Sequence, residues 1–302
     1  MNNKNIALSV RDKLLNHAKK NKRPFNEILQ YYGIERFLYR LSLSDYKDIL
    51  FLKGALLFFV WQISTPRPTR DIDLLGRTSN SPENMMHICR EICTIPCIED
   101  GIYWKQETIR LFPTQNQREY EGFRINFNGS LDTAVIHMQI DVGFSDVVYP
   151  KPAMMDYPCI LNMPQPKLIG YTPESMIAEK AHSVIVLGEL NSRIKDYFDI
   201  WFLSRQFEFK GQRLLDAIAK TFVNRKIDTK LFSVSAVFST NFKHDQEKSM
   251  QWQSFISKNE LTIAPTLFEI AMDEIATFIF PVIKAFETGK TFTKHWNKIT
   301  WV

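Results

Sequence analysis

Residues 68–75 read Pro68-Thr-Arg-Asp-Ile-Asp-Leu-Leu75, and this short β-prone stretch decides how the chain is interpreted. Its two carboxylates, Asp71 and Asp73, are two residues apart. Because successive strand side chains alternate between faces, such a pair projects in one direction, about 6.6 Å apart along the strand. Neighbouring carboxylates need a positive charge between them, and a hard divalent cation with oxygen ligands and substrate phosphates supplies one. The stretch therefore predicts a magnesium–phosphate site, although a solvated edge strand would show the same pattern.

A third carboxylate falls on another predicted strand. Three segments rich in β-branched and aromatic residues, 108–112, 123–127 and 135–144, are separated by turn formers and predict strands. Polar and apolar residues alternate within the last of them. The alternation puts Asp141 on the polar face of a strand that we expect in the interior of the sheet.

A glycine precedes the two aspartates. Residues 49–52 predict a strand, Lys53-Gly54-Ala55 follow, and an apolar helix is expected through Trp61. Glycine at such a junction lets the backbone approach a phosphate, and the helix N-terminus supplies N–H donors and positive dipole. The same junction also occurs as plain turn chemistry. Its place upstream of the carboxylate pair is what makes it informative.

Both ends of the chain are predicted to be helical. Apolar stripes in the first fifty residues indicate helices, and Gly33 is expected to bend or end one of them. Thr172 is a candidate N-cap with Pro173 at the first helical position, which opens a helix to about Leu187. A further helix is expected after Asn191.

The proline-rich stretch at 150–173 predicts a link between two domains. We expect a mixed α/β (α+β) domain with N-terminal helices at residues 1–165. A helical domain is expected at residues 166–302.

Composition indicates an ordinary soluble globular protein. Of its 302 residues, 45% are hydrophobic and 24% charged. The longest apolar run, residues 54–61, is too short to cross a membrane, and the N-terminus lacks the apolar segment of a signal peptide. Four cysteines do not make a disulfide scaffold, so a cytoplasmic location is expected. Cys89, Cys93 and Cys97 either bind zinc or line a helix face as small apolar groups.

Charge is unevenly distributed along the chain, whose net charge is +5. Basic residues exceed acidic ones by five in residues 1–50 and by four in residues 201–302, while residues 51–200 are acidic by four. A metal-binding centre with cationic flanks suits a polyanion such as nucleic acid. Ordinary surface variation would produce excesses of the same size.

Several segments together resemble the AbiEii/AbiGii-type nucleotidyltransferase toxins, a group that includes the MenT toxins. The motifs are Phe51-Leu-Lys-Gly-Ala-Leu-Leu-Phe58, Arg67-Pro-Thr-Arg-Asp-Ile-Asp-Leu-Leu-Gly76, Gln139-Ile-Asp-Val-Gly-Phe-Ser-Asp146, Ala178-Glu-Lys180 and Asn191-Ser-Arg-Ile-Lys-Asp-Tyr-Phe-Asp-Ile200. They span residues 51–200 in the order expected for the family. The N-terminal helices and the last hundred residues carry no family motif.

This resemblance implies a DNA polymerase β-like nucleotidyltransferase core with a mixed sheet and a helical C-terminal domain. It implies a phage-defence or related toxin that uses a nucleoside triphosphate and Mg²⁺ (or Mn²⁺) and is paired with an AbiEi-type antitoxin. MenT-type relatives add nucleotides to the tRNA 3′ end, so the implied acceptor is tRNA or another RNA. A protein or small-molecule hydroxyl as acceptor, and a catalytically silent nucleotide-binding module, are the alternatives.

The resemblance also assigns site residues. Asp71, Asp73 and Asp141 are the expected metal ligands. The expected nucleotide contacts come from Lys53, Gly54, Ala55, Arg70 and Lys180. Two metals 3.5–4 Å apart can stabilise both the attacking and the leaving oxygen of an in-line displacement.

Lys180 and Asp196 complete the expected catalytic set. Lys180 matches the family's lysine helix, although a lone mid-helix lysine is more often solvated. Asp196 is expected to orient Lys180 or to assist proton removal. Asp199, on the same helix face, is expected to pair with Arg193 or Lys195.

Two local features leave alternatives open. Arg67 and Arg70 precede the carboxylates and are equally suited to binding phosphate or to pairing with Asp71 and Asp73. Many relatives have Gly-Gly or Gly-Ser at the phosphate loop, whereas this chain has Gly54-Ala55 and lacks the hydroxyl. We expect activity to be retained, because a backbone N–H at residue 55 still binds phosphate.

Overall fold

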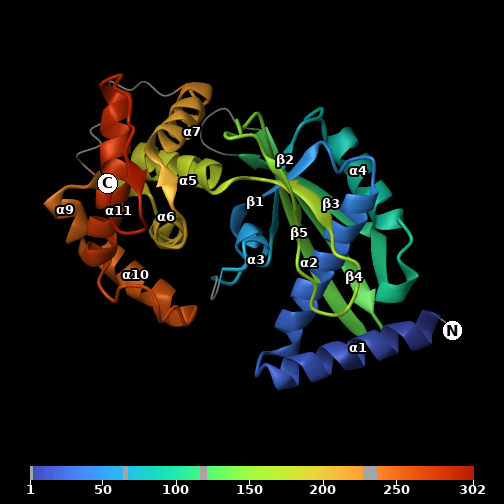
Figure 1. Ribbon diagram of the computed structural model, residues 1–302. Helices are drawn as coiled ribbons and strands as arrows, with labels where there is room; N and C mark the ends of the chain where they lie inside the picture. Colours follow the sequence, from blue (N-terminus) through green and yellow to red (C-terminus); the bar gives the residue numbers. More distant parts are fainter. Residues whose placement is uncertain (1–2, 64–66, 116–120, 227–236) are drawn as a thin grey trace. The chain divides into compact units, whose positions relative to one another are not determined.

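A computed structural model describes residues 3–63, 67–115, 121–226 and 237–302 (Figure 1). The chain separates into two compact units. The first comprises Met1–Ser145 and Ala153–Gly170, and the second comprises Asp146–Pro152 and Tyr171–Val302. The division into 1–165 and 166–302 stays a prediction.

A seven-stranded sheet forms the body of the first unit, in the order β3-β4-β5-β2-β1-β7-β6. The strands are β1 (Leu50–Lys53), β2 (Ile72–Gly76), β3 (Ile102–Gln115), β4 (Glu121–Leu131), β5 (Ala134–Phe144), β6 (Ala153–Asp156) and β7 (Lys167–Gly170). β2 runs parallel to β5 and β1 parallel to β7, while the other neighbours are antiparallel. The predicted mixed α/β class is confirmed. β6 and β7 lie within the stretch that the sequence predicted as a linker.

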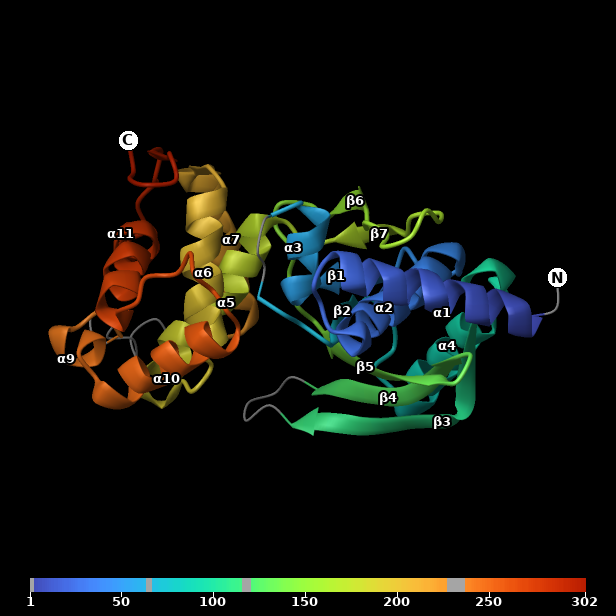
Figure 2. The same ribbon diagram turned by 90° about the horizontal axis from the view of Figure 1, so that it is seen from below.

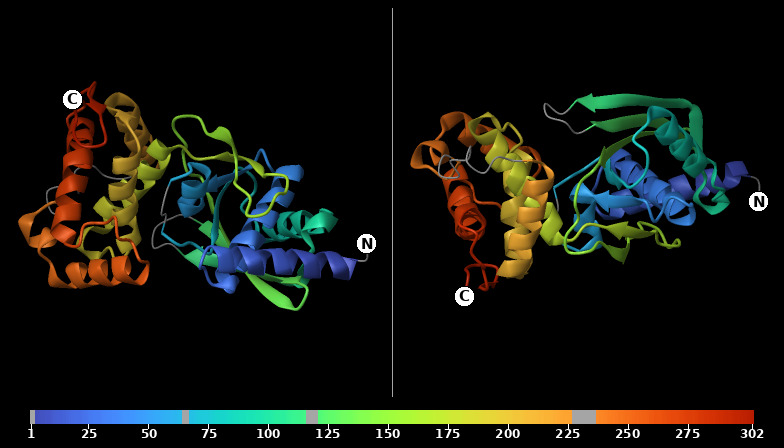
Figure 3. Two further views of the ribbon diagram at one scale, coloured as in Figure 1. Left: turned by 60° about the horizontal axis from the view of Figure 1, so that its bottom comes forward. Right: turned by 90° about the horizontal axis from the view of Figure 1, so that it is seen from above.

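One face of β3, β4 and β5 is buried under helices. The helices are α1 (Asn3–Lys20), α2 (Phe25–Leu43) and α4 (Pro82–Thr94), which pack on β4, β5 and β3 respectively. Ile125, Phe127 and Ile140 are buried on this face, and their polar neighbours in sequence point the other way. Figure 2 shows β3 and β4 as a long two-stranded ribbon, and the right-hand view of Figure 3 shows α4 on its inner side.

Gly33 lies inside α2, although the sequence predicted a bend or an end there. A Cβ atom at residue 33 would lie 2.5 Å from Cγ2 of Ile136 on β5. The prediction was wrong because close packing of helix on strand, and not a chain reversal, requires a residue without a side chain.

Two element boundaries differ from the sequence prediction. β2 begins at Ile72, so Asp71 is the residue just before the strand. The chain after β1 forms a 3-10 turn at Gly54–Leu56 and then the single helical turn α3 (Leu57–Val60). The expected helix through Trp61 is therefore shorter than predicted, and its dipole is correspondingly small.

The second unit is mainly helical. Its elements are α5 (Pro173–Leu187), the 3-10 turn at Gly188–Leu190, α6 (Ile194–Gln206), α7 (Gly211–Asn224), α9 (Thr240–Lys243), α10 (Gln246–Lys258), α11 (Phe268–Glu287) and the short strands β8 (Phe209–Lys210) and β9 (His295–Trp296). As predicted, α5 starts with Pro173 after an N-cap at Thr172, whose hydroxyl accepts the Ser175 N–H at 3.3 Å. Packed aromatic rings, among them Phe198 and Trp252, fill the centre of this unit.

Two further features bear on the sequence predictions. Cys89, Cys93 and Cys97 lie buried on and just after α4, as small apolar groups on a helix face do. Among the described residues, no helix combines the length and the apolar character that a membrane span needs.

Candidate active site

Asp73 and Asp141 are direct partners in the parallel pairing of β2 and β5. Partners at one register position project from the same face of a sheet, so these two carboxylates are neighbours. Asp71 precedes β2 by one residue, and its charge acts on Arg124 together with the charges of Asp73 and Asp141. The first unit thus brings together the three carboxylates that the sequence singled out.

Gly54 lies against the carboxylate of Asp73. Its φ of +71° is left-handed, and a Cβ built on it would lie 2.1 Å from Oδ2 of Asp73. Any other residue at 54 would strain the backbone and collide with this carboxylate. The glycine that the sequence linked to phosphate therefore has a second function, which is to leave room for Asp73.

Arg124 on β4 binds Asp141 from the side of β5 opposite to β2. Its Nε and Nη2 each donate to one carboxylate oxygen of Asp141 over 2.8 Å, and β4 and β5 pair these residues directly. The pKa of Arg124 is raised, first by these hydrogen bonds and then by the charges of Asp141, Asp71 and Asp73. Arg124 therefore interacts electrostatically with all three carboxylates and supplies positive charge to the cluster.

The sequence reasoning missed Arg124, although a signal for it was present. Arg124 alternates with Phe123 and Ile125 in a predicted strand, so it had to lie on the polar face. What the alternation does not reveal is the register that puts it opposite Asp141.

The carboxylates provide a donor set that fits a hard divalent cation. All three are oxygen ligands, and two are linked by a single intervening residue. Within the described part of the chain, however, no three acidic, histidine or cysteine side chains are already assembled as a metal-binding group. The guanidinium of Arg124 binds both oxygens of Asp141. In this arrangement Arg124 provides the positive charge that a cation would otherwise provide.

Three of the expected nucleotide contacts, Lys53, Gly54 and Ala55, lie at the end of β1. Lys53 is the register partner of Asp73 on β1, so that the row across β4, β5, β2 and β1 has two carboxylates in the middle and a cation at each end. Ala55 is buried, so a hydroxyl in its place would point into the core and not towards a ligand. This burial gives a physical reason why Gly54-Ala55 can replace the more usual sequence.

The two arginines before β2 differ in exposure. Arg70 is exposed, and its carbonyl oxygen accepts a hydrogen bond from Gln30 of α2 at 3.3 Å. Arg67 is buried. Of the two, Arg70 has the side chain that can reach a ligand from solvent.

Lys180 lies between two carboxylates in the second unit. Its Nζ is 3.0 Å from Oδ1 of Asp196 and 2.6 Å from Oδ2 of Asp199. Asp199 is fully buried, and Asp196 is nearly so. The predicted link between Lys180 and Asp196 is present, whereas the ion-pair partner of Asp199 is Lys180 and not Arg193 or Lys195. The correction follows from helix packing, since α5 brings Lys180 against the buried face of α6.

Asn191 positions the start of α6. It is fully buried, its Oδ1 accepts the N–H of Arg193 at 2.9 Å, and its carbonyl accepts Nζ of Lys248 at 2.7 Å. A buried lysine bound to a buried loop fixes the point from which α6 presents Asp196. The sequence analysis expected a helix after Asn191 and placed Asn191 in a family motif, but it did not predict that this residue is buried.

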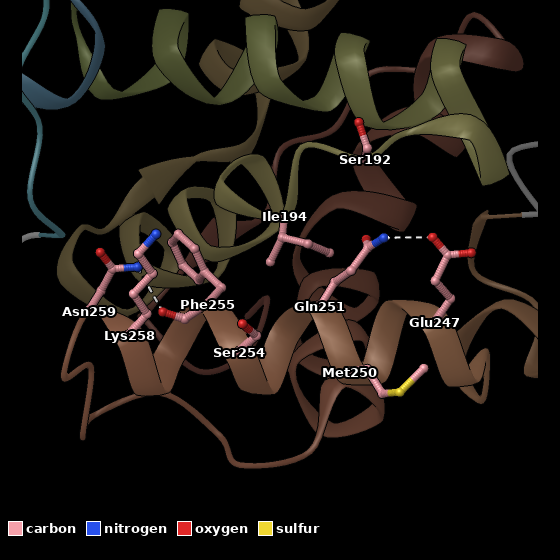
Figure 4. A pocket seen from close by; sticks show the side chains of 9 residues that line it. All are labelled: Ser192, Ile194, Glu247, Met250, Gln251, Ser254, Phe255, Lys258 and Asn259. Carbon is pink, nitrogen blue, oxygen red and sulfur yellow. Dashed lines mark hydrogen bonds between the residues drawn. The ribbon is translucent and has the colours of Figure 1, made fainter.

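An open groove lies beside α6 in the same unit (Figure 4). It has a volume of about 590 Å³ and is lined by Ser192, Ile194, Glu247, Met250, Gln251, Ser254, Phe255, Lys258 and Asn259. Ile194 and Asp196 are two residues apart on one helix, so they point to different sides. Ile194 lines the groove, whereas Asp196 and Lys180 do not.

A mixed sheet with a glycine turn beside paired strand carboxylates is the arrangement of a nucleotidyltransferase. A family model described as "Nucleotidyl transferase AbiEii toxin, Type IV TA system" matches residues 36–276. The match covers well over half of the chain, which therefore belongs to this family of nucleotidyltransferase toxins. Membership implies a nucleoside triphosphate substrate, typically a divalent metal, and an antitoxin partner.

Two solved structures are similar to the chain. JHP933 from Helicobacter pylori has a TM-score of 0.46 and 13% sequence identity, covering 92% of this chain and 94% of its own. An H. pylori protein described as a candidate nucleotidyltransferase has a TM-score of 0.45 and 12% identity, covering 93% of this chain and 99% of its own. No curated protein matches the chain.

Proposed function

We propose that this protein is a metal-dependent toxin that transfers a nucleoside monophosphate from a nucleoside triphosphate to RNA, with the 3′ end of tRNA as acceptor. The observation that carries the chemistry is the register pairing of Asp73 with Asp141, next to Asp71. Family membership supports the same reaction class. The excess of basic residues in the N-terminal helices and the last hundred residues favours a polyanionic acceptor.

In the proposed reaction, an acceptor hydroxyl oxygen forms a bond to the α-phosphorus. The bond between that phosphorus and the β-phosphate oxygen breaks, pyrophosphate leaves, and the hydroxyl proton passes to a base. Mg²⁺ or Mn²⁺ bound by Asp71, Asp73 and Asp141 would neutralise charge on the phosphates. Lys53, the backbone at Gly54 and Ala55, and Arg70 would hold the triphosphate, so that catalysis depends mainly on positioning and charge.

Lys180 and Asp196 are proposed to act on the same triphosphate. Lys180 would contact a phosphate, and Asp196 would orient its ammonium group. Asp199 is better suited to holding Lys180 in place, because it is fully buried. The partner that restrains the toxin would be an AbiEi-type antitoxin in the cytoplasm.

The test is nucleotide labelling in vitro. Purified protein is incubated with total RNA, Mg²⁺ and each of the four labelled nucleoside triphosphates in turn. We expect a labelled band of tRNA size that disappears in Asp71→Asn and Asp73→Asn, which keep the side-chain volume and remove the charge. Label on protein alone would reject the RNA acceptor, and absence of label on any acceptor would reject the enzyme assignment in favour of a silent module.

A further inference from the structure

The side of β3, β4 and β5 that faces away from the helices is polar and exposed. We call it the outward face, and define it as the four register rows from Tyr103–Ser130–Val135 to Phe112–Arg124–Asp141. The residues of β4 in these rows span about 20 Å along the strand. One end of this surface is thus the carboxylate cluster itself.

Two aromatic rings stand on the outward face, one at each end. Tyr103 is 65% exposed and Phe112 is 50% exposed. An exposed aromatic side chain on a sheet surface gains nothing from the core, but it offers a flat apolar face to a ligand ring. Phe112 is the register partner of Arg124, which places it one strand away from the residue that binds Asp141.

Positive charge lies between the two rings. Lys105 and Arg110 occupy the two inner rows on β3, and Arg124 occupies the last row on β4. The acidic residue in the four rows is Asp141, which Arg124 already binds, and Glu107 is exposed in the irregular part of β3 between the two inner rows. The three cations still outnumber these two carboxylates. The surface therefore attracts an anionic chain up to the edge of the carboxylate cluster.

Most of the remaining outward positions carry hydrogen-bonding groups, and Val135 is the apolar exception. His137 Nδ1 and Asn128 Oδ1 are 2.8 Å apart across β4 and β5, and Gln139 contacts Asp141 at 3.4 Å. Amides and a histidine offer both donors and acceptors to base edges.

We propose that the outward face binds the single-stranded end of the RNA acceptor and leads it to Asp141. This inference rests on the proposed transfer to RNA. Stacking of bases on exposed aromatic rings, with cations along the backbone, is how proteins bind single strands. Aromatic rings spaced among cations and amides suit a single-stranded RNA. A protein partner would instead require a contiguous apolar centre on this face.

The experiment measures RNA binding without catalysis. Fluorescence anisotropy follows a labelled single-stranded RNA of about twelve nucleotides, in EDTA and without nucleoside triphosphate. Tyr103→Ala and Phe112→Ala should each weaken binding at least fivefold, which is the lower end of the range for one stacked base. Arg110→Gln should reduce the slope of log K against log[salt] by about 0.7.

Matched control variants lie away from the outward face. Phe280→Ala removes an aromatic ring of α11 that is 38% exposed, and Arg90→Gln removes an exposed cation of α4. Both should bind RNA like the wild type. Thermal unfolding of every variant should match that of the wild type, because all these side chains are exposed.

Unchanged affinity in Tyr103→Ala, Phe112→Ala and Arg110→Gln would overturn the proposal. So would variants that keep RNA binding and lose binding of the antitoxin, since that outcome makes the face a protein surface. Failure of the wild-type protein to label RNA would reject the proposed function instead. The two failures are distinguishable because the binding measurement needs neither nucleotide nor metal.

Discussion

Arg124 and Asp141 face each other across β4 and β5, and the guanidinium donates to both carboxylate oxygens over 2.8 Å. Asp141 is the third carboxylate of the expected metal site, and Arg124 binds both of its oxygens. The charges of Asp71 and Asp73 also raise the pKa of Arg124, so it supplies one positive charge to a cluster of three carboxylates. A divalent cation and Arg124 therefore compete for the same carboxylate.

The first prediction is that Arg124→Gln binds Mn²⁺ more tightly than the wild type, by about five- to tenfold. Removing the partly exposed positive charge of Arg124 should make the binding free energy of the cation more favourable by about 1 kcal/mol. Electron paramagnetic resonance titration of free Mn²⁺ measures this without any activity. Arg90→Gln is the control, and equal or weaker Mn²⁺ binding in Arg124→Gln would refute the competition.

The second prediction separates backbone strain from collision at Gly54. Gly54→Ala should lower nucleotide transfer by about 100-fold or more, because the new Cβ displaces the Asp73 carboxylate. Gly289→Ala is the matched control, since Gly289 also has a left-handed φ of +63° but no heavy atom within 4 Å of a built Cβ. Gly289→Ala should lose about 1 kcal/mol of unfolding free energy, and Gly54→Ala should lose at least as much, because the collision adds to the backbone strain. Equal activity in the two variants would show that Asp73 does not need the space.

The third prediction concerns the ion pairs of Lys180. Lys180→Met leaves Asp196 and Asp199 as neighbouring buried carboxylates and should reduce the free energy of unfolding by about 3–5 kcal/mol. Lys180→Arg should lose much less, because the charge remains. Urea denaturation followed by tryptophan fluorescence measures both.

A double variant tests the cause of that loss. Lys180→Met with Asp199→Asn should regain part of the stability, because it removes one of the two unpaired charges. A double variant no more stable than Lys180→Met would mean that packing, and not charge, is responsible. Loss of activity in Lys180 variants can be assigned to nucleotide binding only after this correction for stability.

The fourth prediction is a pH dependence of stability from His182. Burial, and then the nearby Arg225 guanidinium, lower the pKa of His182 to about 3. The unfolded chain takes up a proton near pH 6.5 while the folded protein does not, so stability falls as the pH drops below 6.5. The loss is about 1.4 kcal/mol per pH unit from this group, down to its folded pKa.

His182→Asn keeps an acceptor for Arg225, whose Nη1 lies 3.2 Å from Nδ1 of His182, and removes the titration. Between pH 7 and pH 5 the wild type should lose about 2 kcal/mol more than the variant. Urea midpoints at the two pH values give the comparison. Parallel behaviour of the two proteins would place the titrating group elsewhere.

Local patterns in the sequence predicted much of the fold correctly. Alternation in the segment around Asp141 gives the polar face of β5, and Thr172-Pro173 marks the start of α5. These features depend on residues close together in the chain, and their period or capping chemistry is visible in one dimension. The prediction for Gly33 was wrong because glycine is required there by close contact with Ile136, which lies about a hundred residues further along the chain.

The chemical groups can be read from the amino-acid sequence: the carboxylates at Asp71, Asp73 and Asp141, the glycine before them, and the motifs that resemble those of nucleotidyltransferase toxins. Which charges meet is set by the folded chain. Strand register puts Arg124 on Asp141, and helix packing puts Lys180 between Asp196 and Asp199. Both contacts join separate elements of the fold. Their partners are therefore set by pairing and packing in three dimensions, which no local periodicity encodes.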